Sequence, residues 1–194
     1  TSGGPIEIRG FIFDISTVGF PTIQNNCTVP LVVADVFNVN GYMNKPGTGQ
    51  EVYFENAAIP GGIIQHGGNV WARQLDVETD STHVLNDGAK FWVLGYKTEG
   101  NGSRGLGFFY TRNGGSSEIL GAFNSTPGNG RYDTVGYTAV DSGMSLAGLS
   151  TGSELRSVIR EEQKGRGHEY TGNHVRYGGS AIPLFTTGRP AGGR

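Results

Sequence analysis

A turn-forming residue ends a short apolar strand six times in the first 125 residues, and few folds accommodate such a repeat. The residues are Gly10, Asp35, Asn56, Gln74, Gly95 and Gly121, at steps of 18 to 26 residues. Five of the six are Gly, Asp or Asn, which enter the left-handed backbone region at low steric cost. Repeats of this length are typical of solenoids, in which each repeat forms one coil. We therefore expect one stacked column of bends.

The residues around each bend alternate as in a strand with one buried face. Of the twelve residues that lie two and four positions before the bends, eleven are apolar, and the exception is Ser117. The residue after each bend is again mostly apolar, as in Phe11, Val36 and Leu75. Successive side chains of a strand point to opposite faces. These positions therefore predict an inward-facing core that continues around the bend.

A second set of turn-forming residues divides the coils between the bends. It includes Asn25-Asn26, Gly67-Gly68, Asp87-Gly88, Gly114-Gly115 and Ser142-Gly143, each after a strand-like run. The two columns together predict an all-β chain folded as a single right-handed parallel β-helix of about six to seven coils. An antiparallel sandwich is the alternative, but it would not need one bend to recur with the same inward pattern.

The composition fits a fold with many tight corners. The 194 residues include 34 Gly, and only 16% are charged. A net charge of −2 and a pI near 6.1 provide no basic stripe for nucleic acid. No apolar run approaches the roughly 20 residues of a membrane helix. We therefore expect neither a nucleic-acid partner nor insertion into a membrane.

Two regions are expected along the chain. Residues 1–150 form the coils, and residues 151–194 form an irregular cap, with a charged edge hairpin followed by a Gly- and Pro-rich tail. The apolar residues Ile182, Leu184 and Phe185 suit this tail to docking on the solenoid wall or to closing its end. No comparable cap precedes Ile6, which predicts either further coils in a longer native chain or self-association through the open end.

Four motifs between residues 69 and 121 add a resemblance. They are NVWARQLDVE at 69–78, HVLNDG at 83–88, FWVLGYKTEG at 91–100 and RNGGSSEILG at 112–121. They resemble the carboxy-terminal coils of bacterial secreted proteins in the pectate-lyase-like superfamily. The resemblance implies a parallel β-helix, a polysaccharide partner and an extracellular or cell-surface location. No motif matches the catalytic residues of characterised members, so the resemblance assigns none.

An aromatic column is expected on the outer face, three positions before the bends. Tyr53, Trp71 and Trp92 occupy it on consecutive coils, which lie about 4.8 Å apart. Arg73 and Glu55 lie beside it, one position before the bend. Such a strip suits an extended glycan, because apolar sugar faces pack on rings while hydroxyl groups meet charges. The alternative is a covered wall, under the tail, a missing domain or a neighbouring subunit.

Two carboxylates after the bend are the candidates for catalysis. Glu78 aligns with Glu99, and Asp76 with Lys97, on adjacent coils. Two stacked carboxylates are unfavourable unless one is protonated or a cation lies between them. They suit a glycosidase acid and nucleophile, or a calcium site with Asp76 and Asp80; side chains turned into water are the plainer alternative. The four histidines have no metal-ligand spacing and are expected in turns or on the surface.

Two functions follow from these features. The first is an extracellular module that binds or helps to process polysaccharide through the aromatic column. This segment alone is expected to be non-catalytic, and the activity that it would otherwise have is that of a polysaccharide lyase or glycoside hydrolase. The alternative is a structural subunit of an extracellular filament, sheath or fibre that assembles by stacking β-helices. No cofactor is expected apart from the calcium alternative, and the fold alone does not decide between the functions.

Overall fold

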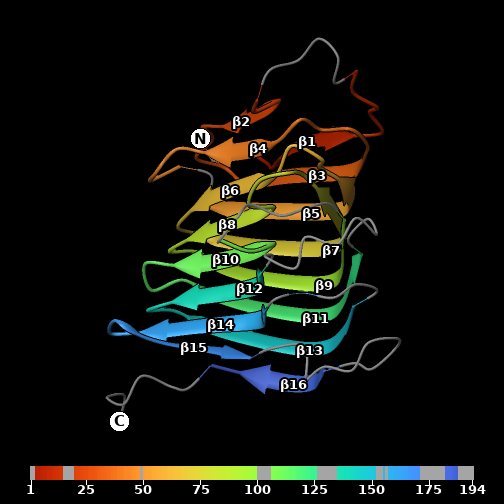
Figure 1. Ribbon diagram of the computed structural model, residues 1–194. Helices are drawn as coiled ribbons and strands as arrows, with labels where there is room; N and C mark the ends of the chain where they lie inside the picture. The colour runs from red at the N-terminus through yellow and green to blue at the C-terminus, as the bar shows by residue number, and fades with distance from the viewer. Residues whose placement is uncertain are drawn as a thin grey trace.

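Two sheets form a parallel β-solenoid of about six coils in the computed structural model of the chain (Figure 1). The structure describes residues 3–14, 20–48, 50–99, 106–125, 135–151, 155, 157–170 and 182–187. The first sheet has the order β1 (Ile6–Arg9), β3 (Leu31–Val36), β5 (Glu51–Ala58), β7 (Asn69–Glu78), β9 (Lys90–Glu99), β11 (Ser116–Ser125), β13 (Gly143–Thr151) and β16 (Ile182–Thr186). The second has the order β15 (Arg166–Tyr170), β14 (Ser157–Gln163), β12 (Val135–Val140), β10 (Phe109–Arg112), β8 (Val84–Asp87), β6 (Ile63–His66), β4 (Tyr42–Asn44) and β2 (Ile23–Asn25).

Neighbouring strands in both sheets are parallel up to β13 and β14. The chain passes alternately from one sheet to the other, one coil after the next. The predicted fold class, an all-β parallel β-helix, is confirmed. No helix in the described part of the chain is long and apolar enough to cross a membrane.

The predicted column of bends is present at all six positions. Their φ angles lie between 49° and 78°, in the left-handed region. Gly148, with φ 67°, continues the column on β13, a position that the repeat pattern did not predict. The long strands pass through the bend without ending, as β11 and β13 show at the right of Figure 1. We call the outer side before the bend the pre-bend face and the outer side after it the post-bend face.

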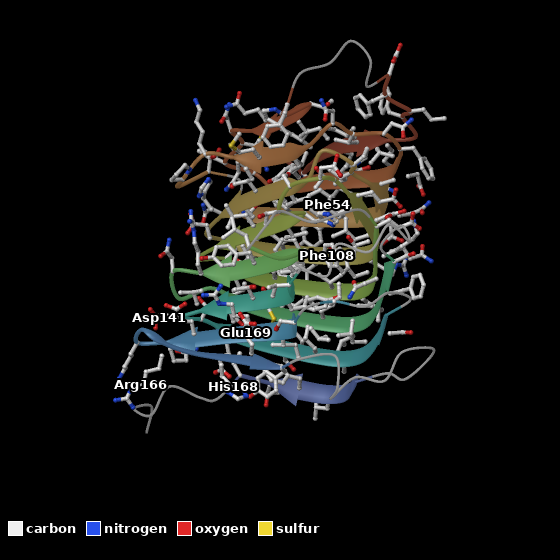
Figure 2. All side chains as sticks on the ribbon, in the orientation of Figure 1. Phe54, Phe108, Asp141, Arg166, His168 and Glu169 are labelled. Carbon is white, nitrogen blue, oxygen red and sulfur yellow. The ribbon has the colours of Figure 1, made fainter. Side chains whose placement is uncertain are left out.

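The core fills the inside of the coils. Inward positions alternate with outward ones along the strands, and Phe54 and Phe108 lie fully inside (Figure 2). Ser117, the polar exception in the inward pattern, is buried where its Oγ accepts a hydrogen bond from Asn86 Nδ2 at 2.8 Å. Asn86 Oδ1 in turn accepts from the backbone N–H of Ala89 at 2.8 Å. The Ser117 hydroxyl is therefore paired with a side chain of the neighbouring coil.

His83 lies inside the protein, although the histidines were expected in turns or on the surface. It is completely buried. Its imidazole nitrogens lie against the Thr98 hydroxyl and the Thr79 backbone carbonyl, at 2.6 Å from the latter. Burial lowers the pKa of His83 to about 4, although hydrogen bonds to the Thr79 and Val77 backbone oppose the shift. The ring is therefore neutral in the folded protein at pH 7.

The carboxy-terminal end is closed by two antiparallel strands. β14 and β15 form the predicted edge hairpin, turning at Lys164 and Gly165, both with positive φ. β16 pairs antiparallel with β13, and the Phe185 ring packs against Tyr170 with centroids 5.1 Å apart. Figure 2 places Arg166, His168 and Glu169 at this end. The tail segment Ile182–Thr186 therefore extends the first sheet and closes the solenoid end, one of the two positions that the sequence allowed.

The first coil is less buried than its pattern predicts. Ile6 and Phe11 pair in register with coil-forming strands, yet their side chains are 43% and 54% exposed. Both occupy inward positions, but no described strand lies beyond β1 to cover them. The inward direction of these two residues was predicted correctly, but their burial was not. A side chain inside a solenoid is buried only when a coil lies on each side of it.

Candidate functional site

The predicted aromatic column exists on the pre-bend face. Tyr53, Trp71 and Trp92 are register partners on β5, β7 and β9. The Tyr53 and Trp71 ring centroids are 4.8 Å apart with planes 10° from parallel, and those of Trp71 and Trp92 are 5.4 Å apart at 11°. Outward side chains at one position of consecutive parallel strands stack in this way because the coil spacing is about 4.8 Å. We call these three residues the aromatic ladder.

The rings of the ladder are offset from one another rather than directly superposed. Parallel rings in contact lie roughly 3.5 Å apart between planes. Centroid distances of 4.8 and 5.4 Å therefore mean that each ring is displaced sideways over the next, in the offset arrangement that aromatic pairs prefer. Each ring therefore covers only part of its neighbour.

The aromatic ladder lies in a groove of about 670 Å³. Its lining includes five charged residues, Arg9, Asp35, Glu55, Arg73 and Glu118. Its apolar residues include Val32, Leu94 and Leu120. Leu94 is 57% exposed and Tyr53 is 36% exposed. β16 pairs with β13, two strands beyond Trp92 in the sheet, so the described part of the tail does not lie over the rings. The alternative that Ile182, Leu184 and Phe185 cover the ladder is therefore wrong.

Arg73 and Glu55 lie beside the ladder as predicted and are joined to each other. Arg73 Nε donates to Glu55 Oε1 at 2.8 Å and Oε2 at 3.0 Å, and Arg73 Nη2 also donates to Oε1. Glu55, first through hydrogen bonding, raises the pKa of the guanidinium of Arg73. A two-point pair fixes the plane of the guanidinium group. The groove therefore carries an oriented donor group next to Trp71.

Lys97 is the cation between the two stacked carboxylates after the bend. Its Nζ lies 3.1 Å from Asp76 Oδ2 and 3.1 Å from Glu99 Oε1, and it also donates to Glu78. Burial opposes the charge of Lys97, but hydrogen bonds to the three carboxylates outweigh it and raise its pKa. Partial burial raises the pKa of Asp76, although the hydrogen bond from Lys97 lowers it. The predicted Asp76–Lys97 ion pair is present, and Lys97 also joins Glu78 to Glu99.

The structure does not bring Glu78 and Glu99 together with the aromatic ladder. Both follow the bend on β7 and β9, whereas Trp71 and Trp92 precede it, and neither glutamate lines the groove. Among the residues with described positions, no group of three or more His, Cys, Asp or Glu side chains is arranged to hold a metal ion. The catalytic and calcium roles of these carboxylates gain no support from this geometry and stay predictions.

A second groove on the post-bend face was not expected. It encloses about 570 Å³, and Phe37, Ala58 and Phe123 contribute to its walls together with Asp76 and Lys97. The outward position two after each bend supplies these side chains. From one end to the other this column holds exposed Phe37, small Ala58, the Asp76–Lys97 ion pair and exposed Phe123. The column could therefore have been predicted from the sequence repeat. The two rings do not stack on one another, because Phe37 directly follows β3 whereas Phe123 is on β11.

Polar side chains on the outer side of the second sheet form a separate network around Asp87. Asp87 Oδ2 lies 3.1 Å from His66 Nδ1 and 3.0 Å from Arg112 Nη2. Burial alone would raise the pKa of Asp87, but hydrogen bonds from Arg112 and Asn113 lower it overall. The three charged or titratable groups come from successive coils, on β6, β8 and β10. The network joins these coils and lies on a different sheet from the aromatic ladder.

No protein-family model, curated protein or solved structure matches the chain significantly. The geometry shows a parallel β-solenoid, and no match confirms the resemblance of the motifs to the pectate-lyase-like superfamily.

Proposed function

We propose that the protein is a glycan-binding module whose binding site is the groove over the aromatic ladder. The observation that carries the proposal is the offset stack of Tyr53, Trp71 and Trp92 in a groove that no described residue covers. Aromatic side chains pack well against the apolar faces of ligands while polar neighbours fix orientation. A straight ladder along the solenoid axis suits an extended chain of sugars.

The polar groups of the groove support this proposal. Arg73 is 63% exposed in its side chain and keeps donors that its pair with Glu55 does not use. These donors lie beside the rings, where the hydroxyl groups of a sugar packed on Trp71 would emerge. Charged hydrogen bonds to hydroxyl groups add orientation to the non-directional packing of the rings.

We infer binding rather than catalysis at this groove. Glycosidase carboxyl pairs lie about 5 to 10 Å apart. Of the three carboxylates that line the groove, Glu55 and Glu118 are on β5 and β11, three coil steps or roughly 14 Å apart. The third, Asp35, is a bend residue that accepts a hydrogen bond from Asn56 Nδ2 at 3.0 Å. Glu55 is also bound to Arg73, and Glu78 and Glu99 are bound to Lys97 on the other side of the bend.

A secreted origin fits the proposal. The motif resemblance to secreted pectate-lyase-like proteins, the solenoid fold and the groove agree with a module that meets polysaccharide outside the cell. We therefore propose an extracellular or cell-surface location, and superfamily membership, as parts of the same hypothesis.

Affinity electrophoresis in gels that contain single soluble polysaccharides tests the proposal. Trp71→Ala and Trp92→Ala should each weaken retardation by at least fivefold, on the scale of about 1 to 3 kcal/mol per stacked ring. Phe123→Ala is the matched control, because Phe123 is an exposed outward ring on β11 outside the groove. Retardation that Phe123→Ala weakens as much as Trp71→Ala, or no retardation by any polysaccharide, would contradict the proposal.

A second candidate function is self-association through the first coil. The edge of β1, which pairs with no described strand other than β3, and the exposed apolar residues Ile6, Phe11 and Ile12 favour it. The other end suits stacking less well, since β16 carries Pro183, which donates no backbone hydrogen bond, and β15 carries Arg166, His168 and Glu169. We therefore propose a contact between two first coils rather than the predicted filament. Sedimentation velocity should show a dimer that Ile12→Asp dissociates, and a monomer at all concentrations would exclude it.

A further inference from the structure

The column of the aromatic ladder ends at a carboxylate. Glu118 on β11 is the register partner of Trp92 and lines the same groove. The side chain is exposed, and it forms no hydrogen bond or ion pair with any described residue. An exposed carboxylate without a partner keeps all its acceptor positions free for a ligand. The groove therefore offers three rings followed by one free anion.

Each cation of the groove is already paired with a carboxylate. Arg9 Nε lies 2.9 Å from Glu7 Oε2, and Arg73 is held by Glu55. The groove lining contains two guanidinium groups and three carboxylates, those of Asp35, Glu55 and Glu118. The local charge is therefore negative, and no guanidinium group is left without a carboxylate partner. A polyanion would meet a free like charge and no free opposite charge.

Beside Glu118 the groove becomes apolar. Leu94 and Leu120 occupy the position next to the ladder on β9 and β11, and they are 57% and 39% exposed. The same column holds Glu55 and Arg73 on β5 and β7. One half of the groove thus combines rings with a paired Arg and Glu, and the other half combines a ring with leucines and a free carboxylate.

We propose that the ligand is a neutral glycan and that the groove discriminates against chains rich in uronic acids. This inference rests on the proposed function and adds the chemical class of the ligand. Neighbouring hydroxyl groups of a neutral sugar donate to Glu118, and its apolar face packs on Trp92 and the leucines. A uronate carboxylate about 4 Å from Glu118 would be repelled even in bulk water, by an amount that weakens binding about fivefold.

The test uses a glycan array and then one matched pair of polymers. A neutral polysaccharide that the array shows to bind is oxidised at its primary hydroxyl groups, which converts them to carboxylates without changing length or linkage. Isothermal titration of the full chain should show binding to the oxidised polymer that is at least fivefold weaker, with a difference that shrinks as salt is added.

Two variants assign the discrimination to Glu118. Glu118→Gln should reduce the difference between the two polymers, because it removes the charge and keeps the shape. Glu51→Gln should leave the difference unchanged, because Glu51 is an exposed residue of the same sheet outside the groove.

The outcomes separate this inference from the proposed function. Binding that is confined to uronate-containing glycans and is lost in Trp71→Ala would overturn the neutral class and leave the glycan-binding groove in place. Equal binding of both polymers would also overturn it. Binding of no glycan on the array would overturn both.

Discussion

Trp71 on β7 and Trp92 on β9 are direct register partners, with ring centroids 5.4 Å apart and ring planes 11° from parallel. They are also the only two tryptophans of the chain. Both therefore report on the same groove, and tryptophan emission from the intact protein is a signal of the aromatic ladder. The two rings stack because they occupy the same outward position on adjacent coils. Their stacking therefore depends on the strand register of the solenoid.

Removal of the Lys97 ammonium should destabilise the fold. In Lys97→Met three carboxylates lose their shared cation, and we expect the free energy of unfolding at pH 7 to fall by about 1 to 2 kcal/mol, a small value because the group is partly exposed. Urea unfolding measures the change. Lys90→Met is the control, since Lys90 is exposed on the same strand without an ion pair among the described residues.

The loss in Lys97→Met should depend on pH. Without the cation, the folded-state pKa of Asp76 rises further above its unfolded value. A carboxyl group with a raised folded pKa stabilises the fold when protonated, and this contribution is lost as the pH rises through that pKa. The difference from the wild type should therefore shrink as the pH falls from 7 to 4. A constant difference would show that packing of the Lys97 stem, not charge, is responsible.

The buried His83 should make stability fall in weak acid. Its pKa is about 4 in the folded protein and about 6.5 in the unfolded chain, so its contribution is complete above pH 6.5 and is lost as the pH falls towards 4. Linkage gives a loss of about 2 kcal/mol between pH 7 and pH 5. Urea unfolding at these two pH values measures it, and His83→Gln should remove most of the difference.

The ring of His83 can also be followed directly. Its NMR resonances should show a neutral imidazole down to about pH 4. Protonation near pH 6.5 in the folded protein would contradict both the burial and the linkage argument, whether or not His83→Gln folds.

Two glycine substitutions should separate backbone conformation from crowding between coils. Gly95 and Gly68 have φ angles of 78° and 76°, so alanine is strained at either position. A Cβ on Gly95 would lie 3.7 Å from the nearest atom, so Gly95→Ala should cost about 1 kcal/mol from conformation alone. A Cβ on Gly68 would lie 2.5 Å from the backbone oxygen of Gln50, so Gly68→Ala should cost at least about 2 kcal/mol more. Equal losses in chemical denaturation would show that the coils are not tightly packed at Gly68.

The column of bends could be predicted because its cause is local. Gly, Asn and Asp at a fixed place in each repeat already indicate positive φ, and Gln74 with φ 55° follows from its place in the column. Gly148 was missed because the strand around it, Gly143–Thr151, lies after a stretch without the regular pattern. The aromatic ladder could be predicted for the same reason as the bends, since register and alternation fix which side chains stack.

Features that depend on long-range contacts were not predictable from the sequence. Ser117 and Asn86 are 31 residues apart, and only folding shows that each satisfies the other. The position of Ile182–Thr186 depends on a free strand edge at β13, which the sequence pattern of the tail does not specify. Lys97 reaches Glu78 as well as its aligned partner Asp76 because flexible side chains extend beyond their own register position.

Tryptophan emission during titration with neutral polysaccharides tests the central claim, that the uncovered aromatic ladder is a glycan site, most directly. Emission of the unliganded protein should be quenched by acrylamide, and a binding glycan should shift the spectrum and protect it with saturation. Phe123→Ala should behave as the wild type. Emission that acrylamide does not quench would show that the rings are covered, and a spectrum unchanged by any glycan that the protein binds would place the binding site elsewhere.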